Sequence, residues 1–416
     1  MDKRQGHDSH LPPRPEGGWS CALVSLPDAL VVPSTVPDLV QPAGVFDAAG
    51  RFVPEAVLWR GRPLMVEPPR PAEAAALPGR WIWGGVLLNH FGHFLTETTG
   101  RLWALDALEG PVDGIVFISK REEADAAGEI AMQAWHRQFF AMLGIDLPVR
   151  ILTAPTRVGL LEVPGQGFGI GPIASGTEAF RAFIRSRFAR DVPAEGPADL
   201  YISRSALSAV RGGVIGETRI EEALAAIGYE VLHPQKHPLE EQVARYKAAR
   251  RIVALDGSAL HLLAMAGGPH QRVAVIKRRD SGASESILRH LAAFTGQPPL
   301  VIDAILRDWV RSDRRRADRH SVGEIDFAAL GPALVAGGFA PPGFAIAPLT
   351  EAESRAAVAA IEEKLRRGGL TFRPVPRGAA VPPPPPPAAQ SGPQAAQQPG
   401  AAAAAGPSRR ELRLAR

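Results

Sequence analysis

An alternation of short apolar runs with amphipathic helical patterns fills residues 176–305 and constrains the fold more than any other feature. The apolar runs lie at 200–203, 230–232, 251–255, 272–276 and 300–302. Helical patterns lie between them at 177–188, 218–227, 239–249 and 284–295, and a further helix opens after the loop at 256–258. Strands that alternate with helices of this length form a parallel sheet covered on both faces. We therefore predict a Rossmann-like domain over residues 176–305.

The preceding part, residues 19–175, has a less regular α/β pattern. Strand-like runs lie at 22–24, 80–88, 114–118 and 158–163, and helical patterns at 91–108 and 129–143. A glycine-rich segment at 165–172 does not fit G-x-G-x-x-G, and Pro172 stands where the helix of that motif would begin. We predict a second α/β domain here, with the glycine-rich segment as a loop or a domain crossing.

The ends of the chain differ in composition from these two domains. Residues 1–18 are polar and proline-rich, which predicts a disordered N-terminus. Residues 306–375 predict a helical extension, with an arginine-rich helix at 306–319 and another at 351–367. The alternating charge signs of the first favour an ion-paired, solvated face over a phosphate-binding patch. The proline and alanine runs of residues 376–416 predict a disordered tail.

Composition excludes several classes of protein. The chain has 416 residues, 45% hydrophobic and 22% charged, as in soluble globular proteins. No apolar run is long enough for a membrane span, and no secretory signal is seen. One cysteine, Cys21, fits a reducing cytoplasm. The net charge of +4 resides in the tail, where five arginines stand against one glutamate, and this argues against a nucleic-acid-binding domain.

A row of polar residues marks the start of the 91–108 helix. His93, Glu97 and Arg101 are spaced at i, i+4 and i+8, so they would share one edge of the helix. A helix N-terminus that directly follows a strand is where open α/β folds place active sites. The same row could instead be a buried ladder that only anchors the helix, and spacing alone leaves both interpretations open.

Two further groups of polar residues follow strands of the second domain. Arg204 ends the first strand, and Arg211 and Glu217 come before the next helix. A guanidinium there could hold a phosphate or carboxylate, although a surface ion pair and a first-turn acid are the plainer alternatives. The loop Asp256-Gly257-Ser258-Ala259 precedes a helix whose free N–H groups could bind an anion. Its plainer alternative is a helix N-cap.

Histidine pairs provide little support for a metal site. His90 with His93, and His233 with His237, have ligand-like spacing, but no carboxylate or cysteine cluster lies near them in the sequence. Core or loop positions are the better interpretation for each.

Taken together, these motifs resemble glycosyltransferase family 61, which includes bacterial capsular polysaccharide biosynthesis proteins. The resemblance covers about residues 80–280. It rests on matches in register: 89–97, Tyr201-Ile202-Ser203-Arg204 with Arg211 and Gly216-Glu217, Gly228–Val231, Glu241-Gln242, and the loop 256–262. Asp256, Leu262 and Gly216 depart from the histidine, asparagine and asparagine that are usual in the family.

The resemblance implies a GT-B-like arrangement of two Rossmann-like domains facing a cleft. It implies an inverting, metal-independent glycosyltransferase that moves a hexosyl or pentosyl group from a nucleotide-sugar, first of all a UDP-sugar, to a glycan or polysaccharide. Donor-binding residues would be Arg204, Arg211, Glu217 and the loop Asp256-Gly257-Ser258-Ala259. Glu97 would be the base, with His93 orienting it or the substrate. The resemblance also implies a cytoplasmic enzyme without other cofactors, which could associate with the inner face of the membrane.

Two alternatives remain from the sequence. The altered loop at 256–262 allows a catalytically weakened relative that serves as a binding or scaffold protein. A parallel sheet alone would also permit a nicotinamide-dependent oxidoreductase, but the chain lacks the G-x-G-x-x-G motif of that class.

Overall fold

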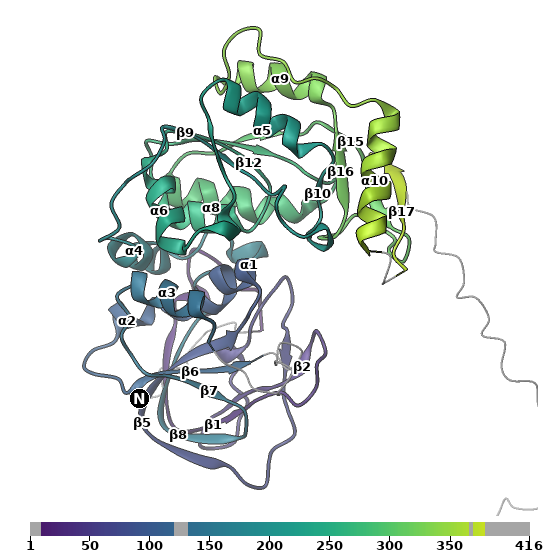
Figure 1. Cartoon of the computed structure of the whole chain (residues 1–416). Coiled ribbons are helices and arrows are strands. Elements are labelled where there is room, and N and C mark those ends of the chain that lie inside the picture. The colour runs from purple at the N-terminus through teal and green to yellow at the C-terminus, as the bar shows by residue number, and fades with distance from the viewer. Residues whose placement is uncertain (1–9, 120–131, 366–368, 379–416) are drawn as a thin grey trace, which may run out of the picture.

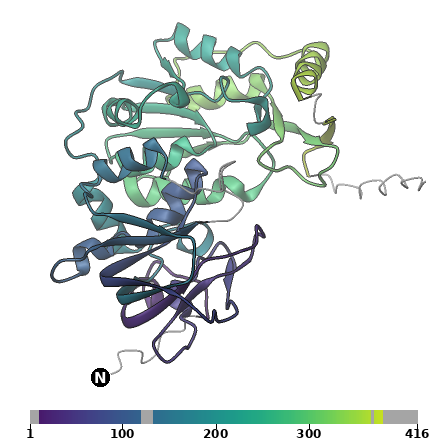
Figure 2. The ribbon, with the colours of Figure 1, turned by 60° about the horizontal axis from the view of Figure 1, so that its bottom comes forward.

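The structure is a computed structural model that describes residues 10–119, 132–365 and 369–378. It contains an N-terminal and a C-terminal half, each built on its own sheet (Figure 1). Figure 2 shows the two halves meeting through a layer of helices between the sheets. The mixed α/β class predicted from the sequence is confirmed.

The N-terminal half is built on a six-stranded sheet of order β3-β1-β8-β5-β6-β7. Its strands are β1 (Leu23–Val32), β3 (Gly44–Phe46), β5 (Ala75–Leu87), β6 (Gly114–Ser119), β7 (Val149–Leu152) and β8 (Thr156–Pro164). β5 is parallel to β6 and β8, and β6 is parallel to β7, whereas β1 runs antiparallel to β3 and β8. This sheet is therefore mixed, unlike the all-parallel sheet of a Rossmann domain. A short parallel pair, β2 (Gln41–Pro42) and β4 (Met65–Val66), lies beside it.

Both faces of the N-terminal sheet are buried, as the alternation along β5 shows. Trp81 and Trp83 point into one apolar cluster, and Ile82 between them points into another that contains Phe94 and Phe117. Successive side chains of a strand face opposite sides, so one strand supplies both clusters. β5 then ends directly before the segment that carries His93.

The helix predicted at 91–108 is broken into four short pieces. They are α1 (Phe91–His93), a π-helical turn at Phe94–Thr98, a 3₁₀ turn at Thr99–Arg101 and α2 (Ala104–Ala107). Threonine hydroxyls accompany the break, and bonds of this kind weaken and bend a helix. Thr96 donates to the Gly92 carbonyl at 2.9 Å and Thr99 to the Leu95 carbonyl at 2.7 Å. Thr98 bonds Val86 and so ties the segment to β5.

The C-terminal half contains the predicted parallel sheet, of order β11-β9-β12-β13-β14. Its strands are β9 (Asp199–Ile202), β11 (Glu230–Leu232), β12 (Arg251–Leu255), β13 (Arg272–Ile276) and β14 (Leu300–Ile302). One face packs against α4 (Glu178–Arg187), α6 (Leu239–Ala248), α7 (Ala259–Ala266) and α8 (Glu285–Thr295), and the other against α5 (Glu217–Ala226) and α9 (Phe327–Ala336). The doubly covered arrangement is visible in Figure 1 and confirms the prediction for this region.

The helical extension predicted at 306–375 is wrong in its first part. Residues 305–311 form strand β15 (Ile305–Arg311) in a second sheet with β10 (Gly213–Val214), β16 (Val322–Ile325) and β17 (Phe372–Pro376). Trp309 and Val310 are buried, and Arg307 bonds Glu324 on the neighbouring strand at 2.8 Å. Arg307 is thus paired across strands, whereas Arg311 and Arg314 pair with the nearby Asp313. The helix α10 (Glu351–Leu365) is present, and residues 366–367 lie outside the described part.

The predicted disorder at the two ends is only partly open to comparison. Residues 1–9 and 379–416 lie outside the described part, as does 129–131 at the start of the predicted helix whose remainder is α3 (Ala134–Met142). Residues 10–18 are ordered, which corrects the prediction for that stretch: the Trp19 indole donates to the Leu11 carbonyl at 2.9 Å, and the Arg14 amide bonds Ser20.

One apolar cluster joins the two halves. It combines Phe94 and Phe139 of the N-terminal half with Val243, Leu260 and Leu263 of the C-terminal half. The glycine-rich segment crosses this junction as a loop, as predicted: the Gly169 carbonyl is 3.0 Å from His290 Nε2, and the Gly171 amide bonds Ser286. The shared core holds the end of β5 close to the C-terminal sheet.

Candidate active site

Glu97 lies in the π-helical turn and has no side-chain exposure. Both of its oxygens are bound by Arg60, whose Nε is 2.7 Å from Oε1 and whose Nη2 is 2.6 Å from Oε2. His93 Nδ1 lies 2.9 Å from Oε2. The predicted i, i+4 contact of His93 with Glu97 is therefore present, and Arg60 is a partner that the sequence did not indicate.

The surroundings of Glu97 keep its carboxylate ionised and also shield it from solvent. Burial favours the protonated acid, yet the hydrogen bonds of His93 and Arg60 outweigh it and hold the pKa of Glu97 below its usual value. Because the carboxylate is fully buried and both of its oxygens are engaged, it is not accessible to a substrate proton. His93, by contrast, is 25% exposed and uses only Nδ1 toward Glu97. Of the two, His93 is the accessible group.

Arg101 does not belong to this row. Its guanidinium donates to the carbonyls of Glu55 and Val57 at 2.8 Å each and to that of Pro164, and the residue is buried. The broken helix removes the i+8 alignment that the sequence suggested. Arg101 therefore anchors the segment, as the structural alternative expected.

The loop Asp256-Gly257-Ser258 joins β12 to α7 and lies directly against α1. A Cβ placed on Gly92 would be 2.7 Å from Ser258 Oγ. Ser258 makes no side-chain capping bond, and Asp256 Oδ1 is instead 2.8 Å from Arg278 Nε. The N-cap explanation of this loop therefore does not hold. The structure brings the predicted loop and the His93 helix together across the junction.

Arg204 and Glu217 form one unit at the end of β9. The Arg204 amide donates to Glu217 Oε1 at 2.7 Å, and the Tyr201 hydroxyl donates to the same oxygen at 3.1 Å. A Cβ on Gly257 would be 2.6 Å from Arg204 Nη1, so the guanidinium packs closely against the loop. Glu217 itself is buried, and burial raises its pKa to about 7. Through its bond to the Arg204 amide, Glu217 helps to hold Arg204 in position.

Arg211 is placed at the rim of this group. Its carbonyl accepts a bond from Arg204 Nη2 at 3.2 Å, while the residue is exposed. Its positive charge acts on His90. The pKa of His90 is lowered to about 4, first by burial and then by the charges of His93, Arg211, Arg319 and Arg60. The predicted residues of both halves therefore share one strongly positive region.

Two arginines that we did not predict complete the positive region. Arg278 and Arg279 follow β13 and are buried. Within the described residues, Arg204 Nε, Arg278 Nη1 and Arg279 Nη1 are buried donors without a hydrogen-bond partner. The pKa values of Arg204 and Arg279 fall to about 10, through burial and then repulsion from Arg278. The basic run after an apolar strand, 277–279, was the signal that could have revealed them.

Buried guanidinium donors without partners indicate an anion site. Such groups cost free energy unless a ligand satisfies them. Guanidinium forks match the oxygens of phosphates or carboxylates. The loop before α7 adds free N–H groups at a helix N-terminus. In the described part of the chain, no cluster of three or more histidine, cysteine or acidic side chains has an arrangement suited to a metal ion.

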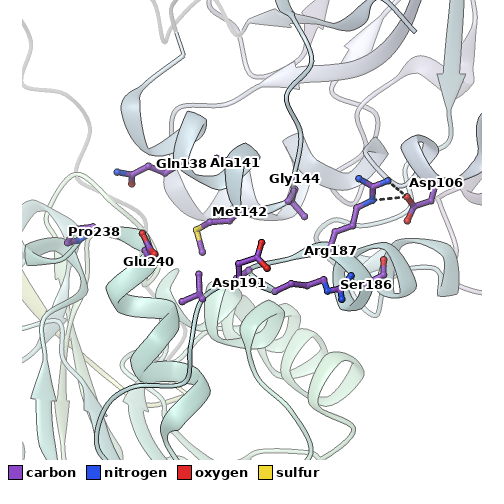
Figure 3. Close-up of a pocket in the computed structure, with 14 residues that line it drawn as sticks. Asp106, Gln138, Ala141, Met142, Gly144, Ser186, Arg187, Asp191, Pro238 and Glu240 are labelled. Carbon is purple, nitrogen blue, oxygen red and sulfur yellow. Dashed lines mark hydrogen bonds and ion pairs between the residues drawn. The ribbon is translucent and has the colours of Figure 1, made fainter. Parts of the chain in front are cut away.

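A separate groove of about 930 Å³ lies between α3, α4 and α6 (Figure 3). It is lined by Gln138, Met142, Asp191 and Glu240, and Arg187 pairs with Asp106 at its edge at 2.6 Å. It shares no residue with the groups described above. Its charged groups are exposed to solvent or paired, so it lacks the buried unsatisfied donors that mark the anion site.

One family of known proteins matches the central part of the chain. The profile of the glycosyltransferase 61 family matches residues 91–273. This range contains His93, Glu97, Arg204, Glu217 and the loop before α7, but ends before Arg278. The chain therefore carries a glycosyltransferase domain, and the enzyme class expected from the sequence is confirmed.

One solved structure matches the chain at low identity and low structural similarity. It is the dodecameric iron-containing heptosyltransferase TibC in complex with ADP-D-β-D-heptose, which is 12% identical, with 84% of this chain and 94% of that chain covered and a TM-score of 0.31. No protein of curated function matches the sequence. Within the described residues, no helix combines the length and apolarity needed to cross a membrane.

Proposed function

We propose that this glycosyltransferase transfers a sugar from a nucleoside diphosphate sugar to a hydroxyl of a glycan, with inversion and without a metal ion. The observation that carries the proposal is the contact of Gly92 with Ser258. Through it, an accessible histidine and a set of unsatisfied guanidinium groups lie on two sides of one junction. A base and an anion-stabilising group are the two parts that such a transfer requires.

The donor would bind to the C-terminal half in a GT-B-like manner. Arg204, Arg278 and Arg279 would contact the diphosphate, and the N–H groups after Gly257 would bind one of its phosphates. As the bond between the anomeric carbon and the phosphate oxygen breaks, its electron pair moves to the diphosphate, and the guanidinium groups stabilise the added charge. This arrangement supports metal independence, because protein cations take the place of a divalent ion.

His93 would act as the base, and Glu97 as its positioning residue. This reverses the roles expected from the sequence. The acceptor oxygen forms its bond to the anomeric carbon from the side opposite the diphosphate, and its proton passes to His93 Nε2. Glu97 holds Nδ1 and stabilises the imidazolium that results, while Arg60 keeps Glu97 ionised.

The finer assignment follows the resemblance to the family. A UDP-linked hexose or pentose is the first donor to test, and a capsule-type polysaccharide or other glycan is the acceptor class. We place the reaction in the cytoplasm, with the acceptor presented at the inner face of the membrane. A relative that only binds glycans is the competing assignment, because Asp256 already neutralises Arg278 in part.

Thermal unfolding with UDP, GDP, CMP and NAD, each with and without EDTA, tests the donor class. A nucleoside diphosphate at about 100 times its Kd should stabilise the protein by about 2.7 kcal/mol, and EDTA should not change the effect. Arg204→Met should lose the response, whereas Arg157→Gln, which removes only a surface pair with Asp28, should keep it. A response to NAD alone, or to no nucleotide, would contradict the proposal, and the latter would favour the binding protein.

A further inference from the structure

A buried pair of histidines lies behind the proposed site and has no part in the mechanism above. His261 is on α7 and His290 on α8, and their Nδ1 atoms are 2.7 Å apart. His290 is fully buried and His261 is 8% exposed. Two imidazoles at this distance share one hydrogen, because one nitrogen must donate and the other must accept.

The backbone determines which nitrogen carries the hydrogen. His290 Nε2 lies 3.0 Å from the Gly169 carbonyl oxygen, which can only accept. His290 Nε2 therefore carries a hydrogen, and in the neutral ring Nδ1 is the acceptor. His261 Nδ1 must then donate to it. It follows that neutral His261 has no hydrogen on Nε2.

The unprotonated edge of His261 faces the helix that carries His93. A Cβ on Gly92 would be 3.5 Å from His261 Cδ2, the ring atom bonded to Nε2, and 2.7 Å from Ser258 Oγ. The pKa of His261 lies well below its usual value. Burial is the largest cause, followed by repulsion from His290 and then from His93 and His90. A pair that stays neutral keeps the tautomer described above.

We propose that His261 is a substrate-binding residue whose Nε2 accepts a hydrogen bond from a sugar hydroxyl, and that His290 is the residue that fixes its tautomer. The hydroxyl belongs either to the transferred sugar or to the acceptor glycan. A histidine used in this way selects a hydroxyl over a group that cannot donate. This inference rests on the proposed function, although the tautomer itself does not.

Nitrogen-15 spectra of the full-length protein with labelled histidine test the tautomer without any substrate. At pH 7 we expect hydrogen on His261 Nδ1 and none on Nε2, with His290 of the opposite kind. His290→Leu should release His261 to a mixture of tautomers. His290→Asn, whose Oδ1 can still accept from His261 Nδ1, should retain the wild-type tautomer. A hydrogen on His261 Nε2 in the wild-type protein would overturn the inference.

Kinetics with UDP-glucose, UDP-N-acetylglucosamine or GDP-mannose test the contact. His261→Phe should lower kcat/KM by roughly 5- to 100-fold, as for a hydroxyl left unpaired in a closed site. A loss already present in donor hydrolysis assigns the hydroxyl to the transferred sugar, and a loss only in transfer assigns it to the acceptor. His290→Leu should show a smaller loss that His290→Asn recovers.

Two outcomes separate this inference from the proposed function. If the wild-type protein turns over no sugar nucleotide, the proposed function fails, and the spectra still decide the tautomer. If it does turn one over, and kcat/KM is unchanged in folded His261→Phe and in His290→Leu, the histidine pair is structural and the inference is wrong.

Discussion

Arg60 donates hydrogen bonds to both carboxylate oxygens of Glu97, at 2.7 and 2.6 Å, and so shields this carboxylate from substrate. The arginine reaches Glu97 from a loop far earlier in the chain, and of the His93–Glu97 pair only His93 is exposed, at 25%. In the proposed mechanism, this carboxylate therefore positions His93 and is not itself the base. The roles of His93 and Glu97 can be separated by measuring both the activity and the free energy of unfolding of variants.

Replacing His93 should affect activity far more than folding. We expect His93→Gln to lower kcat by roughly 10²- to 10⁴-fold, the usual contribution of a general base, and to lower the free energy of unfolding by less than about 1 kcal/mol. Kinetics and urea unfolding on the same preparation measure both. The surface variant His237→Gln, which alters an exposed pair with Glu241, is the control. Equal activity in the two variants would remove His93 as base.

Removing Arg60 should reverse the pH dependence that Glu97 contributes. In the wild type the lowered pKa of Glu97 adds stability above its unfolded pKa of about 4.5, and this is lost as the pH falls further. In Arg60→Met, burial dominates and raises the pKa. The buried Glu97 carboxylate should then lower the free energy of unfolding by about 3 to 5 kcal/mol at pH 7, and by less near pH 4. Urea unfolding between pH 4 and 7 measures the two slopes, and parallel slopes would contradict the pairing.

Glu217 should make the protein less stable as the pH rises. Its pKa is raised by burial to about 7, so the folded state holds a proton that the unfolded state releases above about 4.5. Stability should fall across that window by about 3 kcal/mol. Glu217→Gln retains an acceptor for the Arg204 amide and should abolish this fall. Identical pH profiles of variant and wild type in urea unfolding would show that Glu217 is ionised throughout.

Arg279 should contribute to donor binding without a large role in the fold. Its Nε bonds Ser281 at 3.1 Å, and its Nη1 has no partner among the described residues. We expect Arg279→Met to weaken UDP binding by roughly 10- to 100-fold, since a charge-assisted hydrogen bond contributes about 1.5 to 3 kcal/mol. Calorimetric titration measures the change, with Arg157→Gln as the matched control. Unaltered affinity would place the diphosphate elsewhere.

The contact of Gly92 with Ser258 should be sensitive to a single methyl group. Gly92→Ala places a Cβ 2.7 Å from Ser258 Oγ, so α1 and the loop before α7 must separate. We expect kcat/KM to fall by roughly tenfold or more, since small displacements in a site are costly. Adding Ser258→Gly removes the obstacle and should recover most of the loss. A double variant as impaired as Gly92→Ala would exclude this steric explanation.

The regular second domain could be predicted because its signals are local. The strands β9, β11, β12, β13 and β14 are short, mainly apolar runs, and the helices between them have their own periodicity. The order of these elements along the chain therefore predicted the doubly covered sheet. The predictions of a continuous helix at 91–108 and of a helix at 306–319 were wrong for different reasons. In the first, threonine hydroxyls bond the backbone where the helix is interrupted, which periodicity does not reveal. In the second, the segment begins as strand β15, and its Arg307 pairs with Glu324 on the neighbouring strand.

From the sequence alone came the residue types and their local order: the His93–Glu97 spacing, Arg204 at a strand end, and the loop before α7. Tertiary structure alone decided which of them are open to a ligand. Arg60, Arg278 and Arg279 join the site from distant segments, and the direction of the His261–His290 bond depends on the Gly169 carbonyl. The physical reason is that burial and pairing depend on neighbours in space, and these determine whether a polar side chain serves a substrate or supports another side chain.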